Sequence, residues 1–165
     1  GLQSVHDSTL TIINRKHDFS IFKKVVEQTK NRGISICTHV ILGLPGEDKK
    51  MMMETGRVLS DLGINGVKIH LLYVIKDTLL DKMYLNGDYT CLLQEEYVNI
   101  VCDFLEILPK KIIIQRITGD PHSDELRSPL WAARYRETFN MIQKTLEQRD
   151  SYQGKRFQTK SRQGL

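Results

Sequence analysis

The sequence predicts an α/β fold in which parallel strands alternate with helices. Apolar, β-branched runs at 34–42 and 66–75 predict buried strands. Apolar residues then recur at helical spacing, most clearly over 92–108. This alternation favours a parallel sheet with right-handed crossovers. The loops that follow the strands would share one edge of the sheet, which is where ligands bind in such folds.

Each expected element follows from a local signal. Asp18 can cap a helix that ends at Gly33, and Ser128 with Pro129 predicts the start of the last helix. The expected elements, in chain order, are a strand end at 1–4, a short helix at 9–14, a helix from Phe19 to Gly33, a strand at 34–42, a helix that begins at Glu47 and Asp48 and stops at Gly63, a strand at 66–75, a helical or irregular stretch up to the turn at 86–88, a helix at 92–108, a strand at 111–116, a polar loop at 117–124, and a helix from Ser128 through Leu146.

The net charge of +4 belongs to the C-terminal end of the chain. Residues 151–165 contain four basic residues and no acid, so residues 1–150 sum to zero. The basic balance is therefore no sign of a basic groove across the fold. After Asp150 the sequence loses its periodicity, and we expect a disordered basic tail over 150–165.

The three cysteines, Cys37, Cys91 and Cys102, match no metal-ligand spacing, so we expect reduced thiols in a cytoplasmic protein. No apolar run reaches the roughly 18–20 residues of a membrane span, and no secretory signal is visible. The chain begins at Gly1, without Met and inside an expected strand, which favours a piece of a longer protein.

A Gly-Leu-Pro-Gly segment connects the strand at 34–42 to the next helix. Gly43 and Gly46 can adopt a positive φ or let the backbone approach a ligand closely. The stretch is equally consistent with a plain strand-to-helix turn.

Several stretches together resemble the C-terminal half of a radical S-adenosylmethionine (SAM) enzyme. They are Gly1-Leu2-Gln3-Ser4, 13–17 and 39–47, with 70–78 similar to a sixth barrel strand and 115–120 and 128–131 similar to a C-terminal extension. The most similar branch is the YhcC-like group, which includes relatives of the Elongator catalytic subunit and of the MiaB/NifB enzymes. The resemblance covers nearly all of residues 1–149.

The resemblance implies half of a partial (β/α)6 barrel of the TIM type, with strands four to six in this chain. It divides the chain into a barrel half at 1–109, a strand-helix extension at 110–149 and the tail at 150–165. It also implies a 4Fe-4S cluster that reduces SAM to a 5′-deoxyadenosyl radical. The cluster motif, Cys-x3-Cys-x2-Cys, does not occur in these 165 residues. We therefore expect the cluster ligands upstream and this chain alone to be inactive.

The resemblance also assigns candidate residues for SAM. Gln3 and Ser4 lie on the fourth strand, and Arg15 matches an arginine that reaches the SAM carboxylate. His39 stands where some relatives carry an aspartate that contacts the ribose hydroxyls. The alternatives are that His39 is a core histidine and that Arg15 is a solvated loop residue. The remaining candidates, which would flank the adenine, are Ile41, Gly43, Val74 and Ile75. Relatives often have Gly at Asp77.

Arg116, Asp120 and His122 are the candidates for substrate contact, because exposed polar groups on a loop beyond a strand suit that role. A structural Arg116–Asp120 pair is the alternative. We name no catalytic residue, and we expect His70 in the core.

The relation to the Elongator catalytic subunit suggests a tRNA substrate, and the reaction would need an electron donor such as flavodoxin or ferredoxin. Two other hypotheses remain open. The chain could be a free-standing α/β module that binds a nucleotide-like ligand, or a domain that self-associates through open sheet edges.

Overall fold

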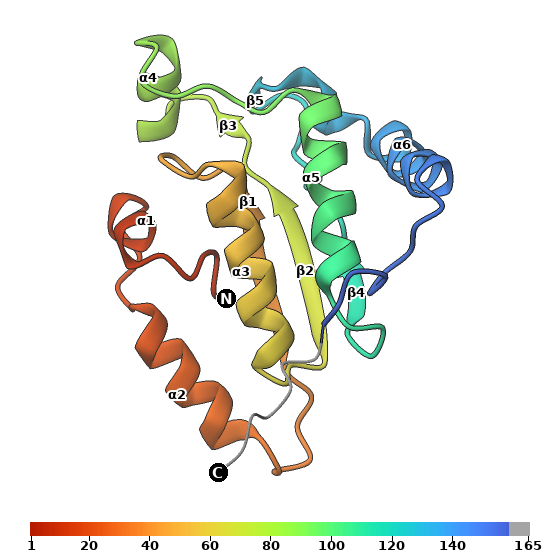
Figure 1. Cartoon of the computed structure of the whole chain (residues 1–165). Coiled ribbons are helices and arrows are strands. Elements are labelled where there is room, and N and C mark those ends of the chain that lie inside the picture. Colours follow the sequence, from red (N-terminus) through yellow and green to blue (C-terminus); the bar gives the residue numbers. More distant parts are fainter. Residues whose placement is uncertain (159–165) are drawn as a thin grey trace.

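The computed structural model describes residues 1–158, and its centre is a three-stranded parallel sheet (Figure 1). The strands are β1 (Cys37–Leu42), β2 (Gly66–Leu71) and β4 (Ile113–Arg116), in the order β1-β2-β4. Gln3 forms an isolated parallel bridge with Val40, so the N-terminal residues lie along the free side of β1. The predicted α/β class and parallel sheet are confirmed, whereas closure into half of a barrel and the boundaries at 109 and 149 stay predictions.

Helices connect the strands. They are α1 (Asp7–Ile12), α2 (Phe19–Thr29), α3 (Lys49–Asp61), α4 (Leu79–Leu85), α5 (Gln94–Ile107) and α6 (Tyr135–Gln148), with a 3-10 turn at Leu130–Ala133. Asp18 caps α2 by accepting a hydrogen bond from the Ile21 backbone N–H, and Asp48 caps α3 in the same way through Met51. Both caps agree with the helix starts that the sequence predicts. None of the described helices is long and apolar enough to cross a membrane.

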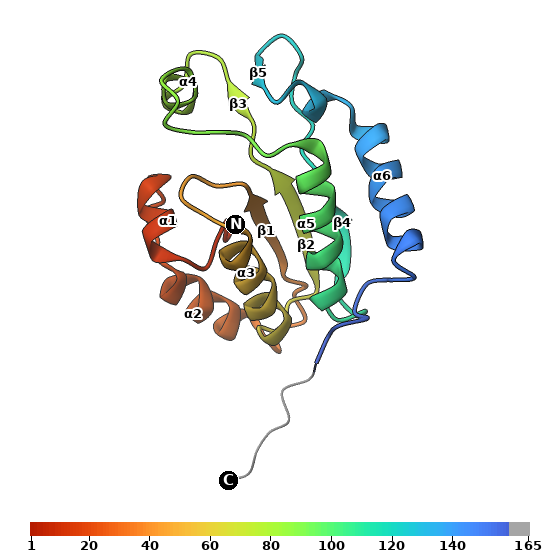
Figure 2. The ribbon, with the colours of Figure 1, turned by 45° about the horizontal axis from the view of Figure 1, so that its top comes forward.

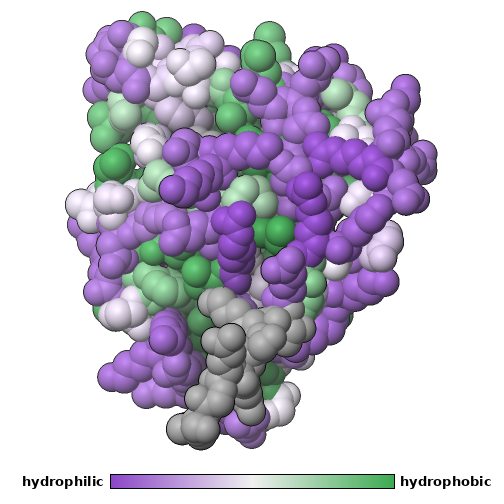
Figure 3. Space-filling model, in the orientation of Figure 1, coloured by the Kyte–Doolittle hydropathy of each residue, from purple (hydrophilic) through white to green (hydrophobic). Residues whose placement is uncertain are grey.

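The two faces of the sheet differ in burial. Val40, Leu42, Ile69 and Leu71 belong to a core that includes residues of α3 and α5. Figures 1 and 2 show these two helices on the same side of the sheet. Hydrophilic residues cover most of that side in the space-filling view (Figure 3). Residues at the alternate positions of β1 and β2 point to the opposite face and are only half-buried.

The expected strand at 66–75 is interrupted. β2 ends at Leu71, and Val74–Ile75 form a separate short strand, β3, that pairs antiparallel with β5 (Leu126–Ser128). The buried ion pair of Arg127 with Asp81 ties this small sheet to α4. A continuous apolar run in the sequence does not reveal such a change of partner strand.

The predicted helix start at Ser128 is wrong. Ser128 pairs with Val74 in the small sheet, and α6 begins only at Tyr135. Trp131 lies between the two elements. Its ring packs against Tyr97, and its Nε1 donates to the Leu92 carbonyl oxygen at 3.3 Å. Strand pairing and the burial of this tryptophan therefore override the local capping signal.

The expectation of disorder from residue 150 is wrong for 151–157. The backbone N–H groups of Gly154 and Arg156 donate to the carbonyl oxygens of Leu105 and Glu106, at 3.0 and 2.8 Å. The Gln153 side chain donates to the Pro109 and Ile112 carbonyl oxygens. Because the last carbonyls of a helix lack partners within it, these bonds complete the C-terminal end of α5. The rest of the expected tail, residues 159–165, lies outside the described residues.

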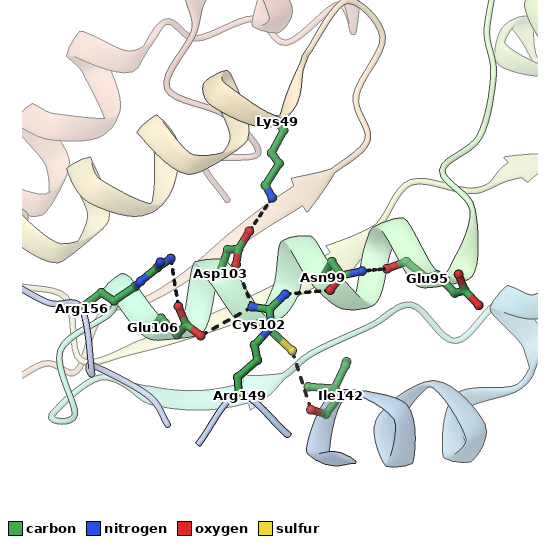
Figure 4. Close-up of polar contacts among 9 residues, drawn as sticks. All are labelled: Lys49, Glu95, Asn99, Cys102, Asp103, Glu106, Ile142, Arg149 and Arg156. Atoms are coloured by element: carbon green, nitrogen blue, oxygen red, sulfur yellow. Dashed lines mark hydrogen bonds and ion pairs between the residues drawn. The ribbon is translucent and has the colours of Figure 1, made fainter. Parts of the chain in front are cut away.

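A network of charges on α5 extends this contact (Figure 4). It consists of Lys49, Asn99, Asp103, Glu106, Arg149 and Arg156, and we call it the α5 charge network. Arg149 bonds Asp103 and Asn99, both at 2.7 Å, and contacts Glu106 at 3.5 Å. Lys49 contacts Asp103 from α3, and Arg156 contacts Glu106. Each carboxylate of the network therefore has basic partners.

Candidate functional site

The register of the sheet brings polar side chains together on its half-buried face. His39 pairs with Lys68 across β1 and β2, and Lys68 pairs with Arg116 across β2 and β4. Ile41 pairs with His70 one step further along. Paired residues of β1 and β2 project to the same face, so the side chains of these two strands share one surface. The register of β4 shifts just before Arg116, but the Arg116 charge acts on both His39 and His70, which places it near this surface. With Gln3 these side chains form what we call the polar sheet face.

Two histidines stack at the centre of this face. The ring centroids of His39 and His70 lie 5.3 Å apart, with an angle of 25° between the planes. Burial lowers the pKa of both imidazoles, and the charges of Lys68 and Arg116 lower it further. Both rings are therefore neutral at pH 7 and can form hydrogen bonds without carrying charge.

Two buried polar atoms of this face have no partner within residues 1–158. They are Oε1 of Gln3 and Nε2 of His70. Gln3 has a positive φ of 68°, which is uncommon for a residue other than glycine. Its amide lies beside Gly1 and His39, since a Cβ built on Gly1 would come within 2.5 Å of Gln3 Nε2 and 3.2 Å of His39 Cβ. The backbone thus holds a polar side chain over the face without satisfying its oxygen.

The turn after β1 uses the glycine conformations that the sequence suggests. Gly43 and Gly46 have φ values of +86° and +80°. The Gly43 N–H contacts Met52 Sδ at 3.3 Å, and its carbonyl oxygen accepts from the Tyr89 hydroxyl at 2.8 Å. A Cβ on Gly43 would lie 3.1 Å from Leu92. The backbone of Gly43 is therefore bonded within the protein.

Ser4 also has an internal role. It is almost fully buried, and its hydroxyl donates to Glu47 Oε1. Burial raises the pKa of Glu47 above its usual value, although the hydrogen bond from Ser4 opposes the change. This contact joins the N-terminal segment to the start of α3.

Three other candidates for SAM lie outside the polar sheet face. Arg15 is exposed and donates to the Gly1 carbonyl oxygen, beside a cleft of about 220 Å³ between the N-terminus and α2. Val74 is buried in the small sheet with β5, and Ile75 follows it. The structure thus brings Gln3, His39 and Ile41 together. Arg15 contacts Gly1, which lies beside Gln3 and His39, whereas Val74 and Ile75 belong to the small sheet.

The substrate candidates are divided in a similar way. Arg116 ends β4 beside Lys68, whereas Asp120 and His122 are exposed on the loop that follows. Among residues 1–158, no ion pair joins Arg116 to Asp120, so the alternative of a structural pair is wrong.

Sequence reasoning missed Lys68 and misplaced His70. His70 is half-buried and stacked on His39 rather than enclosed in the core. The sequence signal that could have found them is alternation along the strand, because Lys68 and His70 alternate with the apolar residues Val67 and Ile69 and so share the opposite face. Alternation alone could not tell which face is covered by helices.

Within residues 1–158, no group of three or more His, Cys, Asp or Glu side chains could hold a metal ion. The cysteines are free thiols, half-buried at Cys37 and Cys91 and buried at Cys102. Burial raises the pKa of the Cys91 thiol and raises that of Cys102 to about 11. The described residues therefore contain unpartnered polar atoms but no cluster of metal ligands.

The fold and the polar sheet face define an α/β domain of parallel βα units with one half-buried polar face. The chain belongs to the radical SAM superfamily, whose family model matches residues 1–59, while the radical SAM C-terminal domain matches residues 64–148. Members of this superfamily generally use SAM and a 4Fe-4S cluster. The two matches confirm the family membership that the resemblance of the sequence predicted.

The chain is similar to several curated proteins. It is 46% identical over 158 residues to the uncharacterized protein YtqA of Bacillus subtilis, covering 96% of this chain and 49% of that protein. Protein YhcC of Escherichia coli K12 is 32% identical over 131 residues, covering 79% of this chain and 42% of YhcC. A tRNA uridine(34) acetyltransferase of Methanocaldococcus jannaschii is 28% identical, covering 73% of this chain and 23% of the enzyme. This chain thus spans about half or less of the length of these relatives.

A solved structure supports the fold. Archaeal Methanocaldococcus infernus Elp3 with an N-terminal deletion superposes with a TM-score of 0.80 at 22% sequence identity, covering 93% of this chain and 36% of that one.

Proposed function

We propose that this chain is the part of a radical SAM enzyme whose polar sheet face binds SAM and borders the substrate. The observation that carries the proposal is the pair of buried, unpartnered atoms, Gln3 Oε1 and His70 Nε2, in a chain of this superfamily. A buried polar atom without a partner costs about 1–3 kcal/mol. A ligand that supplies the missing hydrogen bonds would recover that free energy.

The side chains of the polar sheet face suit the polar parts of SAM. Gln3 Oε1 would accept a hydrogen bond from a ligand amino or hydroxyl group. The neutral His70 ring would donate or accept through Nε2, depending on its tautomer. Ile41, beside His70 in the register, offers apolar surface to a ring such as adenine.

The 4Fe-4S cluster of this family, when bound, supplies the electron for reductive cleavage of SAM. Its ligands would come from a part of the full-length protein outside the residues described here, and the electron from a donor such as flavodoxin or ferredoxin. The role of this chain is to bind and orient SAM and the substrate.

A tRNA substrate is the finer part of the proposal. It is supported by the similarity to a tRNA uridine(34) acetyltransferase and to a tRNA-2-methylthio-N(6)-dimethylallyladenosine synthase of Anaplasma phagocytophilum, which is 36% identical over 38% of this chain. Lys68 and Arg116 would favour an anionic substrate, and such contacts weaken as salt rises.

The test uses the full-length protein that contains this chain, purified and reconstituted without oxygen. Iron and sulfide content, and 5′-deoxyadenosine formed from SAM under dithionite, are the measurements. About four irons per chain, as one 4Fe-4S cluster requires, together with SAM cleavage are the expected result. A preparation that holds no cluster and leaves SAM intact would contradict the proposal, and salt-sensitive binding of tRNA tests the substrate separately.

A further inference from the structure

Two basic side chains on the polar sheet face have no acidic partner. Lys68 and Arg116 are register partners on neighbouring strands, and no ion pair among residues 1–158 includes either of them. Arg127 and Arg149, by contrast, are each held by a carboxylate at 2.7 Å. Like charges on paired positions of a sheet repel each other. An anion between Lys68 and Arg116 would remove that repulsion.

The histidine pair adjoins these cations. His39 is the register partner of Lys68 on the side away from Arg116, so the three residues form a row across the sheet. His70 stacks on His39, and its Nε2 is buried without a partner. Within residues 1–158, the charged side chains that act on the two imidazoles are Lys68 and Arg116, and no carboxylate acts on them. The row therefore presents hydrogen-bond groups and positive charge together.

We propose that Lys68 and Arg116, together with the His39–His70 pair, form a subsite for an anionic group, a carboxylate or a phosphate, of a bound ligand. The inference rests on the proposed function, because it assigns a chemical class to the ligand of the same face. It goes further by placing the negative charge of the ligand at one end of the row, next to Lys68 and Arg116.

The chemistry of the four side chains fits an anion. A guanidinium binds carboxylate or phosphate through two parallel N–H donors, and an ammonium adds a point charge. A neutral imidazole N–H donates a further hydrogen bond. His39, Lys68 and His70 are half-buried, which strengthens their contacts relative to open water, whereas Arg116 is exposed.

Inorganic phosphate is the probe for the first experiment. It is titrated into the full-length protein labelled with 13C in the histidine rings, and the ring signals of His39 and His70 are followed by NMR at pH 7. The variants His39→Gln and His70→Gln assign the two signals. Lys68→Met and Arg116→Met remove the charges, and Lys144→Met, on the exposed side of α6, is the matched control.

We expect a saturable shift of both ring signals in the wild-type protein and in Lys144→Met. The phosphate affinity should fall at least about tenfold in Lys68→Met and in Arg116→Met, since a hydrogen bond to a charged group contributes at least that factor. A shift that does not saturate, or that is unchanged in both variants, would overturn the subsite. The unbound ring signals report whether each variant is folded.

A second titration, with SAM, identifies the source of the anion. If the carboxylate of SAM occupies the subsite, SAM displaces phosphate and binds more weakly to Lys68→Met and Arg116→Met. If the anion belongs to the substrate, phosphate and SAM bind together and the two variants keep the wild-type affinity for SAM. If SAM does not bind the wild-type protein at all, the proposed function fails, and the phosphate titration still decides the subsite.

Discussion

The polar sheet face and the α5 charge network both contain basic and polar residues, but they differ in whether the basic side chains have carboxylate partners. In the network, Arg149 and Lys49 hold Asp103, and Arg156 with Arg149 holds the buried Glu106. On the sheet face, Lys68 and Arg116 have no carboxylate partner within residues 1–158, and Gln3 and His70 each keep an unpartnered atom.

The difference separates a region whose charges are paired within the described fold from a region whose charges are not, and it supports the proposed ligand site on the sheet face. A cleft of about 730 Å³ lies beside the network, between α3 and α5, and is larger than the cleft at Arg15. Its basic residues, however, are already paired with Asp103 or Glu106 of the network, so size alone is a poor guide to a binding site. Unpartnered buried atoms next to unpaired charges are the better guide, because folding rarely leaves both together. Thr38, Thr118 and Ser151 also have a hydroxyl oxygen that is unpartnered within residues 1–158.

The largest predicted effect comes from breaking the network. Arg149→Leu would leave two carboxylates with one basic partner each. Glu106, whose side chain is 4% exposed, would keep Arg156, and Asp103 would keep Lys49. We expect a loss of about 1.5–3 kcal/mol in the free energy of unfolding, measured by urea titration, because the variant loses hydrogen bonds between charged groups of the network.

Arg134→Leu is the matched control for that substitution. Arg134 pairs with Glu137 on the surface of α6, with side chains 57% and 44% exposed. Its loss should cost no more than about 0.5 kcal/mol. Equal costs for the two variants would show that the network does not stabilise the fold.

A smaller effect is expected from pH. The folded-state pKa values of His39 and His70 lie below the usual value of the unfolded chain, so the unfolded state binds more protons as the pH falls below about 6.5. Their contribution to stability is therefore fully present above that pH and declines as the pH falls toward the folded-state values.

Urea midpoints at pH 7.5 and 5.5 test this sign. The double variant His39→Gln with His70→Gln should lose less stability between the two values than the wild-type protein. An equal loss in both proteins would mean that groups other than these two histidines control the pH dependence.

The smallest effect on stability is expected on the sheet face itself. Lys68→Met should change the free energy of unfolding by less than about 0.5 kcal/mol, or raise it slightly, because it breaks no ion pair and relieves repulsion from Arg116. The same urea titration measures it beside Arg149→Leu. A loss comparable to that of Arg149→Leu would place Lys68 among the structural residues.

Local signals in the sequence predicted much of the fold. The period of α5, the caps Asp18 and Asp48, and the glycines after β1 follow from short-range geometry, and each is confirmed. The resemblance of the sequence to radical SAM enzymes also grouped Gln3, His39 and Ile41 among the candidate residues for SAM.

What the sequence could not predict depends on contacts between distant segments. The pairing of β3 with β5 puts Val74 and Ile75 in a separate small sheet, and residues 151–157 are bonded to α5. His70 was misplaced because its role depends on which sheet face the helices cover.

The most direct test of the central claim removes one unpartnered atom of the sheet face. Gln3→Met preserves the length of the side chain but deletes its carboxamide, and Gln143→Met, exposed on α6, is the control. SAM affinity of the reconstituted full-length protein is measured for both, with iron content and urea midpoint as checks on folding. The account predicts about tenfold weaker SAM binding for Gln3→Met only, with the iron content unchanged and the urea midpoint unchanged or higher. Wild-type SAM affinity in Gln3→Met would contradict a ligand-binding role for the polar sheet face.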